Sequence, residues 1–394
     1  MMKKLIFGIT SLTIGGAERV LVDLVNNVCD KYDTTIITIY SNGKLEEQLS
    51  DKIKIKSIYS KSYNDLSKIR KTIATLKVLL FRKQIYNKYI RNSGKNCSYD
   101  TEIAFLEGPI TRLFSVKNNY TKKIAWIHND TYISLKKGIK NKIKKHIDSK
   151  IYTKYNTIVF VSKDSKEKFE KVYKNLKNKQ GKDIEIKVIY NYIDSKRTIS
   201  LSNIDNDIEK EIKLDDNQIN FLTVARLVED KAIDRIIRVH SKLIKEGFNH
   251  RFYVIGDGPL KKELENCIKK YDVEDTFILL GEKTNPYPYI KRVEYFCLLS
   301  KAEGYGMVIE EAKILDKKIL ITDTGAREAV AGYKKSMIFD NEEQSIYEGL
   351  KKIVAEKVNI EYRKDIEVKQ NKENNKELYD NSNIINEIID LVGE

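Results

Sequence analysis

The feature that most constrains the fold is a repeated alternation between short, β-branched apolar runs and longer stretches with helical spacing, such as residues 18–28. Buried parallel strands have continuous apolar sequences because helices cover both faces of their sheet. The first half therefore predicts a doubly wound α/β domain. Its predicted strands are residues 5–9, 35–39, 101–105, 124–127 and 157–161.

After Asp194 the pattern lapses into a polar stretch, residues 195–216, and then starts again. A chain of 394 residues suits two domains of this kind. We predict a first Rossmann-like domain at 1–195, a second at 217–375, and a C-terminal segment at 376–394 whose helix returns to the first domain. The strands predicted for the second domain are residues 221–224, 252–255, 277–280, 296–299 and 319–321.

The net charge of +15 indicates an anionic partner, or it reflects only the codon usage of an AT-rich genome. Aromatic-interleaved basic motifs are absent from the sequence, which argues against nucleic acid as that partner. The four scattered cysteines form no C-x-x-C pair, which argues against a zinc site and fits a reducing cytoplasm. The apolar N-terminus mimics a signal peptide, but a buried strand followed by a helix explains it better.

A glycine-rich loop that carries carboxylates follows the strand predicted at 296–299. It begins at Glu303 and opens a helix that contains Glu311, eight positions later. Gly304 and Gly306 let a ligand approach the backbone, and the start of a helix offers unpaired N–H groups to a phosphate. The two carboxylates can accept hydrogen bonds from different hydroxyl groups of one extended ligand.

Two cations follow the strand predicted at 221–224. Arg226 lies at its end, and Lys231 lies near the start of the next helix. An arginine and a lysine that converge on one ligand neutralise a diphosphate. The carboxyl ends of parallel strands form the ligand-binding edge of such a sheet, so both segments are predicted to lie there.

Together these motifs resemble the donor domain of family 4 glycosyltransferases, which have the GT-B fold of two Rossmann-like domains facing a cleft. Glu303 and Glu311 match the family's E-x7-E motif, and Arg226 and Lys231 match its diphosphate-binding pair. The segments 254–259 and 322–328, and the glycine-rich first loop at 14–19, are also similar to the family pattern.

The resemblance implies a retaining glycosyltransferase that uses a nucleoside-diphosphate sugar, with UDP expected before GDP. Glu311 would bind the ribose and Glu303 the transferred sugar. Gly15 and Gly16 would approach the phosphates, and residues 281–283 would lie near the base. The sugar and diphosphate would also be held by the backbone amides of Gly304, Tyr305, Gly306, Met307 and Val308.

His128 follows the strand predicted at 124–127 and matches the family's active-site histidine, which would contact the donor sugar. A capping or structural role is the alternative. Two departures from the family pattern concern local geometry: Ala232 stands where a glycine is usual, and residues 190–194 lack the usual proline or glycine.

The expected chemistry is stabilisation of the charge that develops on the leaving diphosphate, by Arg226, Lys231 and helix amides. We therefore expect no cofactor and no metal. The D-x-D pattern at 205–207 falls in the polar stretch, without a preceding strand to fix it. A sugar-nucleotide epimerase, a basic nucleic-acid-binding protein and a non-catalytic homologue are the alternatives.

Two basic amphipathic stretches lie in the first domain, which in this family faces the acceptor. Either their apolar stripes pack on the sheet, or they bind an anionic membrane surface. The second option suits a lipid-linked or glycan acceptor in cell-surface polysaccharide synthesis, and a cytoplasmic enzyme peripheral to the inner face of the membrane. The stripes are Leu135, Ile139, Ile143, Ile147 and Ile151, and Ile69, Ile73, Leu76 and Leu80.

Overall fold

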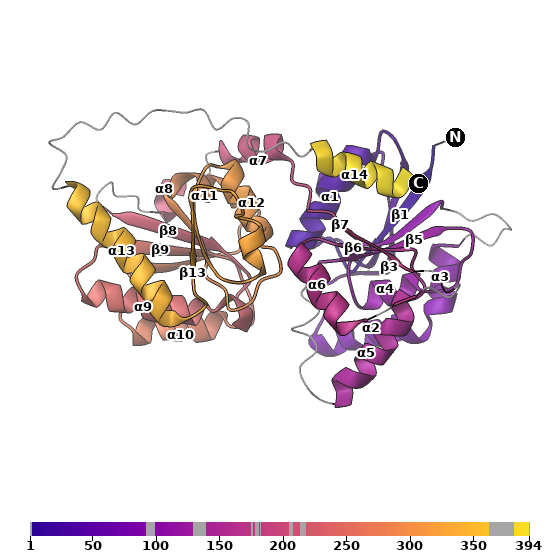
Figure 1. Ribbon diagram of the computed structural model, residues 1–394, viewed down its shortest axis with the longest axis horizontal. Helices are drawn as coiled ribbons and strands as arrows, with labels where there is room; N and C mark the ends of the chain where they lie inside the picture. The colour runs from indigo at the N-terminus through magenta and orange to yellow at the C-terminus, as the bar shows by residue number, and fades with distance from the viewer. Residues whose placement is uncertain are drawn as a thin grey trace. The chain divides into compact units, whose positions relative to one another are not determined.

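The chain has two compact units, Met1–Ile193 with Asn381–Glu394, and Asp194–Asp380. Each is a parallel β-sheet with helices packed on it (Figure 1). The predicted fold class, two Rossmann-like doubly wound α/β domains, is confirmed. The structure is a computed structural model that describes residues 2–91, 99–128, 139–174, 176–177, 181, 183–204, 208–212, 218–361 and 382–393.

In the first unit the strands pair in the order β3-β2-β1-β4-β5-β6-β7, and every pairing is parallel. The strands are β1 Lys4–Ile9, β2 Asp33–Ser41, β3 Lys54–Ser62, β4 Thr101–Ala104, β5 Lys122–Ile127, β6 Thr157–Phe160 and β7 Glu185–Val188. The helices are α1 Gly16–Val28, η1 Glu46–Gln48, α2 Lys68–Leu80, α3 Arg82–Tyr89, α4 Pro109–Phe114, α5 Ile139–Tyr152, α6 Lys163–Val172 and α14 Ser382–Gly393.

In the second unit the order is β10-β9-β8-β11-β12-β13, again with parallel pairings. The strands are β8 Ile219–Val224, β9 His250–Ile255, β10 Phe277–Gly281, β11 Tyr295–Leu298, β12 Lys318–Thr322 and β13 Ser336–Phe339. The helices are α7 Ser195–Ser202, α8 Ile208–Glu211, η3 Glu229–Lys231, α9 Ile233–Lys245, α10 Lys261–Lys270, α11 Tyr287–Arg292, α12 Met307–Ile314, η4 Gly325–Glu328 and α13 Glu343–Glu361.

Three strands, β3, β7 and β13, were not predicted from the sequence. All three lie at a sheet edge, and their side chains are largely half-buried or exposed. The predicted strands are interior ones, apart from β10, and their residues are mostly buried, which gives them continuous apolar sequences.

The polar stretch at 195–216 is not a plain boundary, because α7 and α8 form there and belong to the second unit. Asp194 caps α7 by accepting a hydrogen bond from the Arg197 amide (2.9 Å). The Asn285 side chain donates to the carbonyl of Leu201 (2.9 Å), which ties α7 to the loop before α11. Polar side chains from outside the stretch thus cap α7 and anchor it.

Helix α14 packs on the first unit at the start of its strands. Tyr32 Oη donates to the carbonyl of Ile389 (3.4 Å), and Lys122 Nζ donates to that of Leu391 (2.8 Å). The carbonyls at the end of α14 thereby receive partners, as helix C-termini require.

Candidate functional site

The second unit has a topological switch point between β8 and β11. From β8 the chain passes to β9 on one side, whereas β11 is followed by β12 on the other side. The loops at the carboxyl ends of two such strands diverge and leave room for a ligand. The two predicted motifs follow these two strands: Arg226 and Lys231 come after β8, and Glu303 comes after β11.

Arg226 is exposed just beyond the end of β8, and its guanidinium makes no ion pair or hydrogen bond with any side chain that the structure describes. The backbone beside it is held closely against the loop that follows β9. Leu227 N donates to the carbonyl of Asp257 (3.0 Å). A Cβ atom on Gly256 would lie 1.9 Å from the carbonyl oxygen of Ala225, so only glycine fits there.

Glu303 and Lys231 form a partly buried ion pair, which was not predicted from the sequence. The two loops that carry them are also joined through the backbone, because Lys301 N donates to the carbonyl of Asp230 (2.8 Å). The structure therefore brings one predicted phosphate-binding cation and one predicted sugar-binding carboxylate into direct contact.

The loop after β11 is braced by side chains from three different places in the fold. Buried Arg235 on α9 is one of them, and burial lowers its pKa from the usual arginine value. Rigid support of this kind fixes the position from which Glu303 extends. The donors are Arg235 Nη2 to Leu299 O (2.9 Å), Thr322 Oγ1 to Ser300 O (2.5 Å) and Asn341 Nδ2 to Lys301 O (2.7 Å).

The predicted amide cradle, Gly304 to Val308, forms the start of α12. Gly306 is the N-cap residue with φ of +80°, and a Cβ there would lie 2.8 Å from a methyl group of Leu298. The first amides of a helix have no partner within the helix, so this end presents donors to an anion. The side chain of Tyr305 is buried and donates to Glu310 Oε1 (2.6 Å).

Glu311 is buried in α12, and Tyr287 Oη donates to its Oε1 atom (2.9 Å). Sequence reasoning missed Tyr287, which begins α11 between Pro286 and Pro288. A tyrosine between two prolines at the start of a helix is the signal that could have identified it. Its hydroxyl restricts the orientation of the carboxylate predicted to bind ribose.

In the first unit, the corresponding switch point lies between β1 and β4. Gly15 is the N-cap of α1, and Gly16 is the first residue of that helix. A Cβ on Gly15 would lie 2.2 Å from a carboxylate oxygen of Glu18, so a larger residue there would displace the Glu18 side chain. Both predicted glycines thus lie at a helix N-terminus on the carboxyl edge of this sheet.

His128 follows β5, one strand away from that switch point. Its ring packs against Phe105 at a centroid distance of 4.7 Å and stacks on Trp126 at 6.4 Å. Burial lowers its pKa to about 3, so the imidazole is neutral near pH 7. Its Nε2 atom has no hydrogen-bond partner among the described residues, which is also true of Nδ1 of His240 and Nε2 of His250.

Residues 281–283, predicted to lie near the base, begin with the last residue of the edge strand β10, two strands away from β8. Lys283 is paired with Glu211 of α8 (2.5 Å). The described part of the chain contains no cluster of histidine, cysteine and carboxylate side chains that would hold a metal ion. The D-x-D pattern at 205–207 lies outside the described residues.

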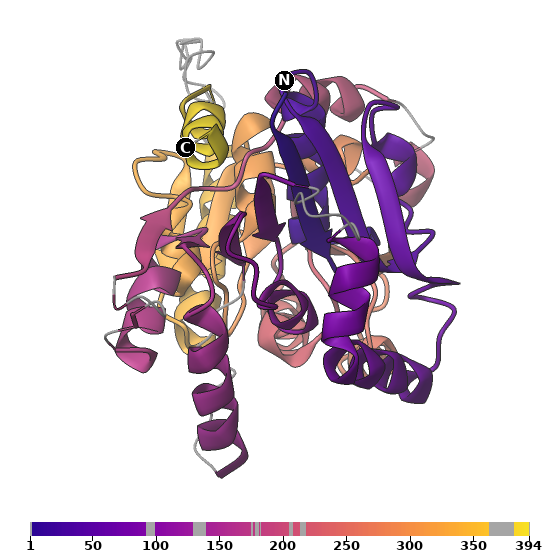
Figure 2. The same cartoon turned by 90° about the vertical axis from the view of Figure 1, so that its right-hand side faces the viewer.

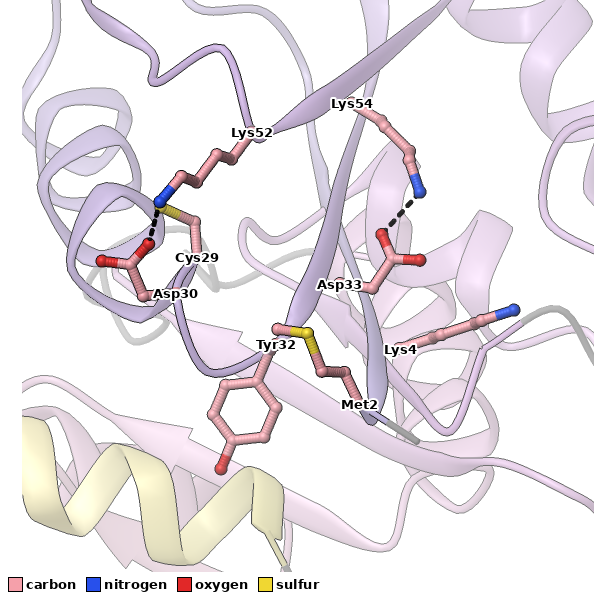
Figure 3. Close-up of a pocket in the computed structure, with 8 residues that line it drawn as sticks. All are labelled: Met2, Lys4, Cys29, Asp30, Tyr32, Asp33, Lys52 and Lys54. Carbon is pink, nitrogen blue, oxygen red and sulfur yellow. Dashed lines mark hydrogen bonds and ion pairs between the residues drawn. The ribbon is translucent and has the colours of Figure 1, made fainter.

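A cavity of about 540 Å³ lies at the amino ends of β1, β2 and β3, at the sheet edge opposite Gly15 and Gly16 (Figure 3). Four of its five charged side chains are paired, Lys52 with Asp30 (2.5 Å) and Lys54 with Asp33 (2.7 Å), and Lys4 is the fifth. This cavity therefore lacks the converging free polar groups of a ligand site.

Residues 204–377 match the family Glycosyl transferases group 1 and fall within the second unit. The chain is 28% identical over 364 residues to N-acetylgalactosamine-N,N'-diacetylbacillosaminyl-diphospho-undecaprenol 4-alpha-N-acetylgalactosaminyltransferase of Campylobacter jejuni, covering 90% of this chain and 91% of that protein.

A second protein of the same organism is 26% identical over 319 residues, covering 79% of this chain and 77% of that protein. It is GalNAc-alpha-(1->4)-GalNAc-alpha-(1->3)-diNAcBac-PP-undecaprenol alpha-1,4-N-acetyl-D-galactosaminyltransferase.

Two solved structures share the fold. One is Anabaena HepE in complex with UDP and glucose, with a TM-score of 0.69, 14% identity and 99% of both chains covered. The other is WaaG, a glycosyltransferase involved in lipopolysaccharide biosynthesis, with a TM-score of 0.70, 13% identity, and 98% of this chain and 99% of that chain covered. Within the described residues, every helix is too short or too polar to traverse a lipid bilayer.

Proposed function

We propose that this chain, whose second unit carries a Glycosyl transferases group 1 domain, is a retaining glycosyltransferase of bacterial glycan synthesis. It would transfer a hexose-type sugar from a nucleoside-diphosphate sugar to a lipid-linked or glycan acceptor. The observation that carries the proposal is the convergence of Arg226, Lys231, Glu303 and the start of α12 at one switch point.

The donor diphosphate would lie between the exposed guanidinium of Arg226 and the first amides of α12. Both groups attract anions, and Lys231 lies beside them on η3. Cleavage of the sugar–phosphate bond leaves negative charge on the diphosphate, which fixed cations stabilise in the transition state. This role for fixed cations is why we propose that the reaction needs no metal ion.

Glu303 would accept hydrogen bonds from the transferred sugar, and Glu311 from the ribose of the nucleotide. A buried carboxylate that is already held by Tyr287 selects a ligand hydroxyl of fixed position. For the first unit, we propose that Gly15 and Gly16 approach the donor phosphates. The neutral ring of His128 would form a polar contact with the donor sugar.

We propose UDP as the nucleotide of the donor, in agreement with the UDP bound to HepE. A lipid-linked acceptor is supported by the names of the two Campylobacter relatives, which both specify an undecaprenol-linked saccharide. Such an acceptor is anchored in a membrane, so the enzyme would work at the inner face of the cell membrane.

Thermal shift of the full chain with UDP, GDP or ADP, each in the presence of EDTA, tests the proposal. UDP is expected to raise the midpoint of wild-type unfolding, because a ligand that binds only the folded state stabilises it. Glu311→Ala is expected to abolish that rise, and Glu265→Ala, an exposed glutamate on α10, is expected to retain it.

If GDP or ADP raises the unfolding midpoint of the wild type and UDP does not, the proposed base of the donor is wrong and the proposed site stands. A response to UDP that Glu311→Ala retains in full would remove Glu311 from the site. The absence of any response to the three nucleotides would overturn the proposal.

A further inference from the structure

Helix α2 has two faces of different character. Its inner face packs on the first unit: Val78 is buried, Tyr40 Oη donates to the carbonyl of Lys71 (3.1 Å), and Tyr59 Oη donates to that of Ala74 (3.4 Å). Ser67 caps the helix by accepting a hydrogen bond from the Arg70 amide (3.4 Å). The helix is therefore held in place without the residues of its outer face.

The outer face is an apolar stripe that is open to solvent. Its side chains are 72% exposed at Ile69, 47% at Ile73, 51% at Leu76 and 74% at Leu80. Their spacing of four, three and four residues places them within roughly 60° of one another around the helix. Phe81, directly after the end of α2, is a further exposed apolar residue (52%). The stripe does not pack on the sheet, which was one of the two options that the sequence left open.

The charges around this stripe have one sign. From Leu66 to Tyr89 the sequence contains seven lysines and arginines and no aspartate or glutamate. Five exposed cations make no ion pair with any side chain that the structure describes. They are Arg70 and Lys77 on α2, and Arg82, Lys83 and Lys88 on α3.

Helix α5 repeats this pattern at the same end of the first unit, the lower end in both Figure 1 and Figure 2. Ile143 is 57% exposed and Ile147 is 41% exposed, and Lys142, Lys144 and Lys145 beside them are exposed as well. Ile151, the next residue of the stripe, is buried. Leu135, the first residue of the predicted stripe, lies outside the described residues. The stripe is therefore open to solvent at Ile143 and Ile147 and closed at Ile151.

We propose that the outer face of α2, Ile69, Ile73, Leu76, Leu80 and Phe81, docks on an anionic lipid bilayer. An apolar stripe flanked by lysine and arginine lies in the membrane interface, with apolar side chains among the acyl chains and cations against acidic headgroups. A protein partner for this face would need an apolar surface bordered by acidic side chains. A bilayer with acidic headgroups supplies that complementarity over its whole surface.

None of these residues is assigned to the nucleotide site, and the surface does not depend on which donor is used. It adds a membrane-binding element to the proposed enzyme. The element explains how a chain with no membrane-spanning helix among its described residues can reach a lipid-linked acceptor.

Co-sedimentation of the full chain with lipid vesicles tests the docking surface. We expect the chain to bind vesicles of phosphatidylcholine mixed with phosphatidylglycerol and to leave pure phosphatidylcholine vesicles largely unbound. The double variant Ile73→Glu/Leu76→Glu is expected to weaken binding at least about tenfold, because it places two carboxylates in the interface. Lys77→Gln is expected to weaken it about fivefold, the effect of one cation near an anionic surface.

Ile199→Glu is the matched control, because Ile199 is 49% exposed on α7 of the second unit, and it is expected to bind like the wild type. Equal binding to both kinds of vesicle, or wild-type binding by the double variant, would overturn the proposal. Self-association without vesicles, abolished in the double variant, would assign the face to a second copy of the chain and also overturn it.

A UDP-dependent thermal shift of the double variant shows that it is folded and keeps the two proposals separate. Lost vesicle binding with an intact UDP response supports the docking surface. If the wild type binds vesicles but shows no thermal shift with any of the three nucleotides, the proposed enzymatic function is overturned and the proposed docking surface stands.

Discussion

The two units bury their charged side chains in different places. In the first unit, Glu102 and Lys123 pair at 3.0 Å near the amino ends of β4 and β5, away from the sheet edge that carries Gly15. In the second unit, Arg235 and Glu311 are buried around the carboxyl ends of β8 and β11. Removing a charged side chain from water costs free energy, so we expect each buried charge to serve either the fold or the candidate site. We infer that the first unit uses buried charge for its fold, and the second uses it for its site.

The largest expected effect concerns the buried pair of the first unit. Lys123→Met leaves Glu102 without its ion-pair partner, which is expected to reduce the free energy of unfolding by about 3–5 kcal/mol. The loss should be followed by the fluorescence of Trp126, the single tryptophan, which is buried in the same unit. Urea denaturation monitored by this fluorescence measures it.

The double variant Glu102→Leu/Lys123→Met removes both charges and is expected to regain part of that loss. Lys54→Met breaks an exposed pair and should cost less than about 1 kcal/mol. If Lys123→Met costs no more than Lys54→Met, the assignment of the buried pair to folding is wrong.

The second expected effect concerns Arg235. Arg235→Met removes the donors to Leu299 O and to Asn341, and should reduce the free energy of unfolding by about 2–3 kcal/mol. It should also weaken the thermal response to UDP, because Glu303 loses its support. Arg238→Met, on the same helix but in half-exposed ion pairs, is the control and should keep the UDP response. If Arg235→Met loses stability but keeps the full thermal response to UDP, the role of Arg235 is structural only.

The stability of the second unit at low pH tests whether the fold keeps its two buried histidines neutral. Burial lowers the pKa of His250 to about 4 and that of His240 well below its usual value. Both are neutral in the folded state and take up protons on unfolding below pH 6.5. Their contribution to stability is therefore complete above pH 6.5 and falls below it, by up to about 1.4 kcal/mol per pH unit for each histidine. The loss from His250 ends near pH 4, its pKa in the folded state.

Circular dichroism melts of wild type and His250→Phe across this pH range measure the effect. The carboxylates titrate equally in both proteins, so the difference between the two curves reports on the histidines. It contains the loss of His250 and a smaller change at His240, because His250 helps to lower the pKa of His240. Identical pH dependence in both proteins would show that His250 is not held neutral by the fold.

Much of the candidate site in the second unit could be predicted from the sequence, whereas the exposure of α2 in the first unit could not. Arg226, Lys231, Glu303 and Glu311 were identifiable because a motif's spacing along the chain sets its position relative to a strand end. Arg235, Thr322 and Asn341 were not, since a side chain that hydrogen-bonds a distant carbonyl leaves no periodic signal. The exposure of α2 was also undetermined, because an amphipathic pattern fits both a buried and a membrane-facing stripe.

A smaller effect is expected for Tyr287→Phe. It removes one hydrogen bond to Glu311 and should cost about 1 kcal/mol of stability. Affinity for UDP, measured by calorimetry, should fall about fivefold, because the carboxylate loses its fixed orientation. Tyr333→Phe removes a comparable hydroxyl bond, to the carbonyl of Lys317 (2.8 Å), and should leave UDP affinity unchanged. Equal UDP affinities for both variants would contradict the positioning role of Tyr287.

The smallest effect concerns Ala232, which occupies a left-handed conformation with φ of 50° directly after Lys231. This conformation costs an alanine roughly 1 kcal/mol, and glycine avoids that cost but loses more entropy on folding. Ala232→Gly is therefore expected to stabilise the fold by no more than about 0.5 kcal/mol. Asp272→Gly, at a φ of 54° after α10, is the control for backbone relief alone.

The two variants should differ in UDP binding, since Ala232 joins Lys231 to the start of α9 and restricts the backbone that presents this lysine. Ala232→Gly is expected to weaken UDP binding slightly, by about twofold, whereas Asp272→Gly is expected to leave it unchanged. If both variants gain stability and neither changes UDP binding, the strained alanine has no part in positioning Lys231. The second unit would then hold this cation by its ion pair to Glu303 and by the backbone contacts of the loop after β11.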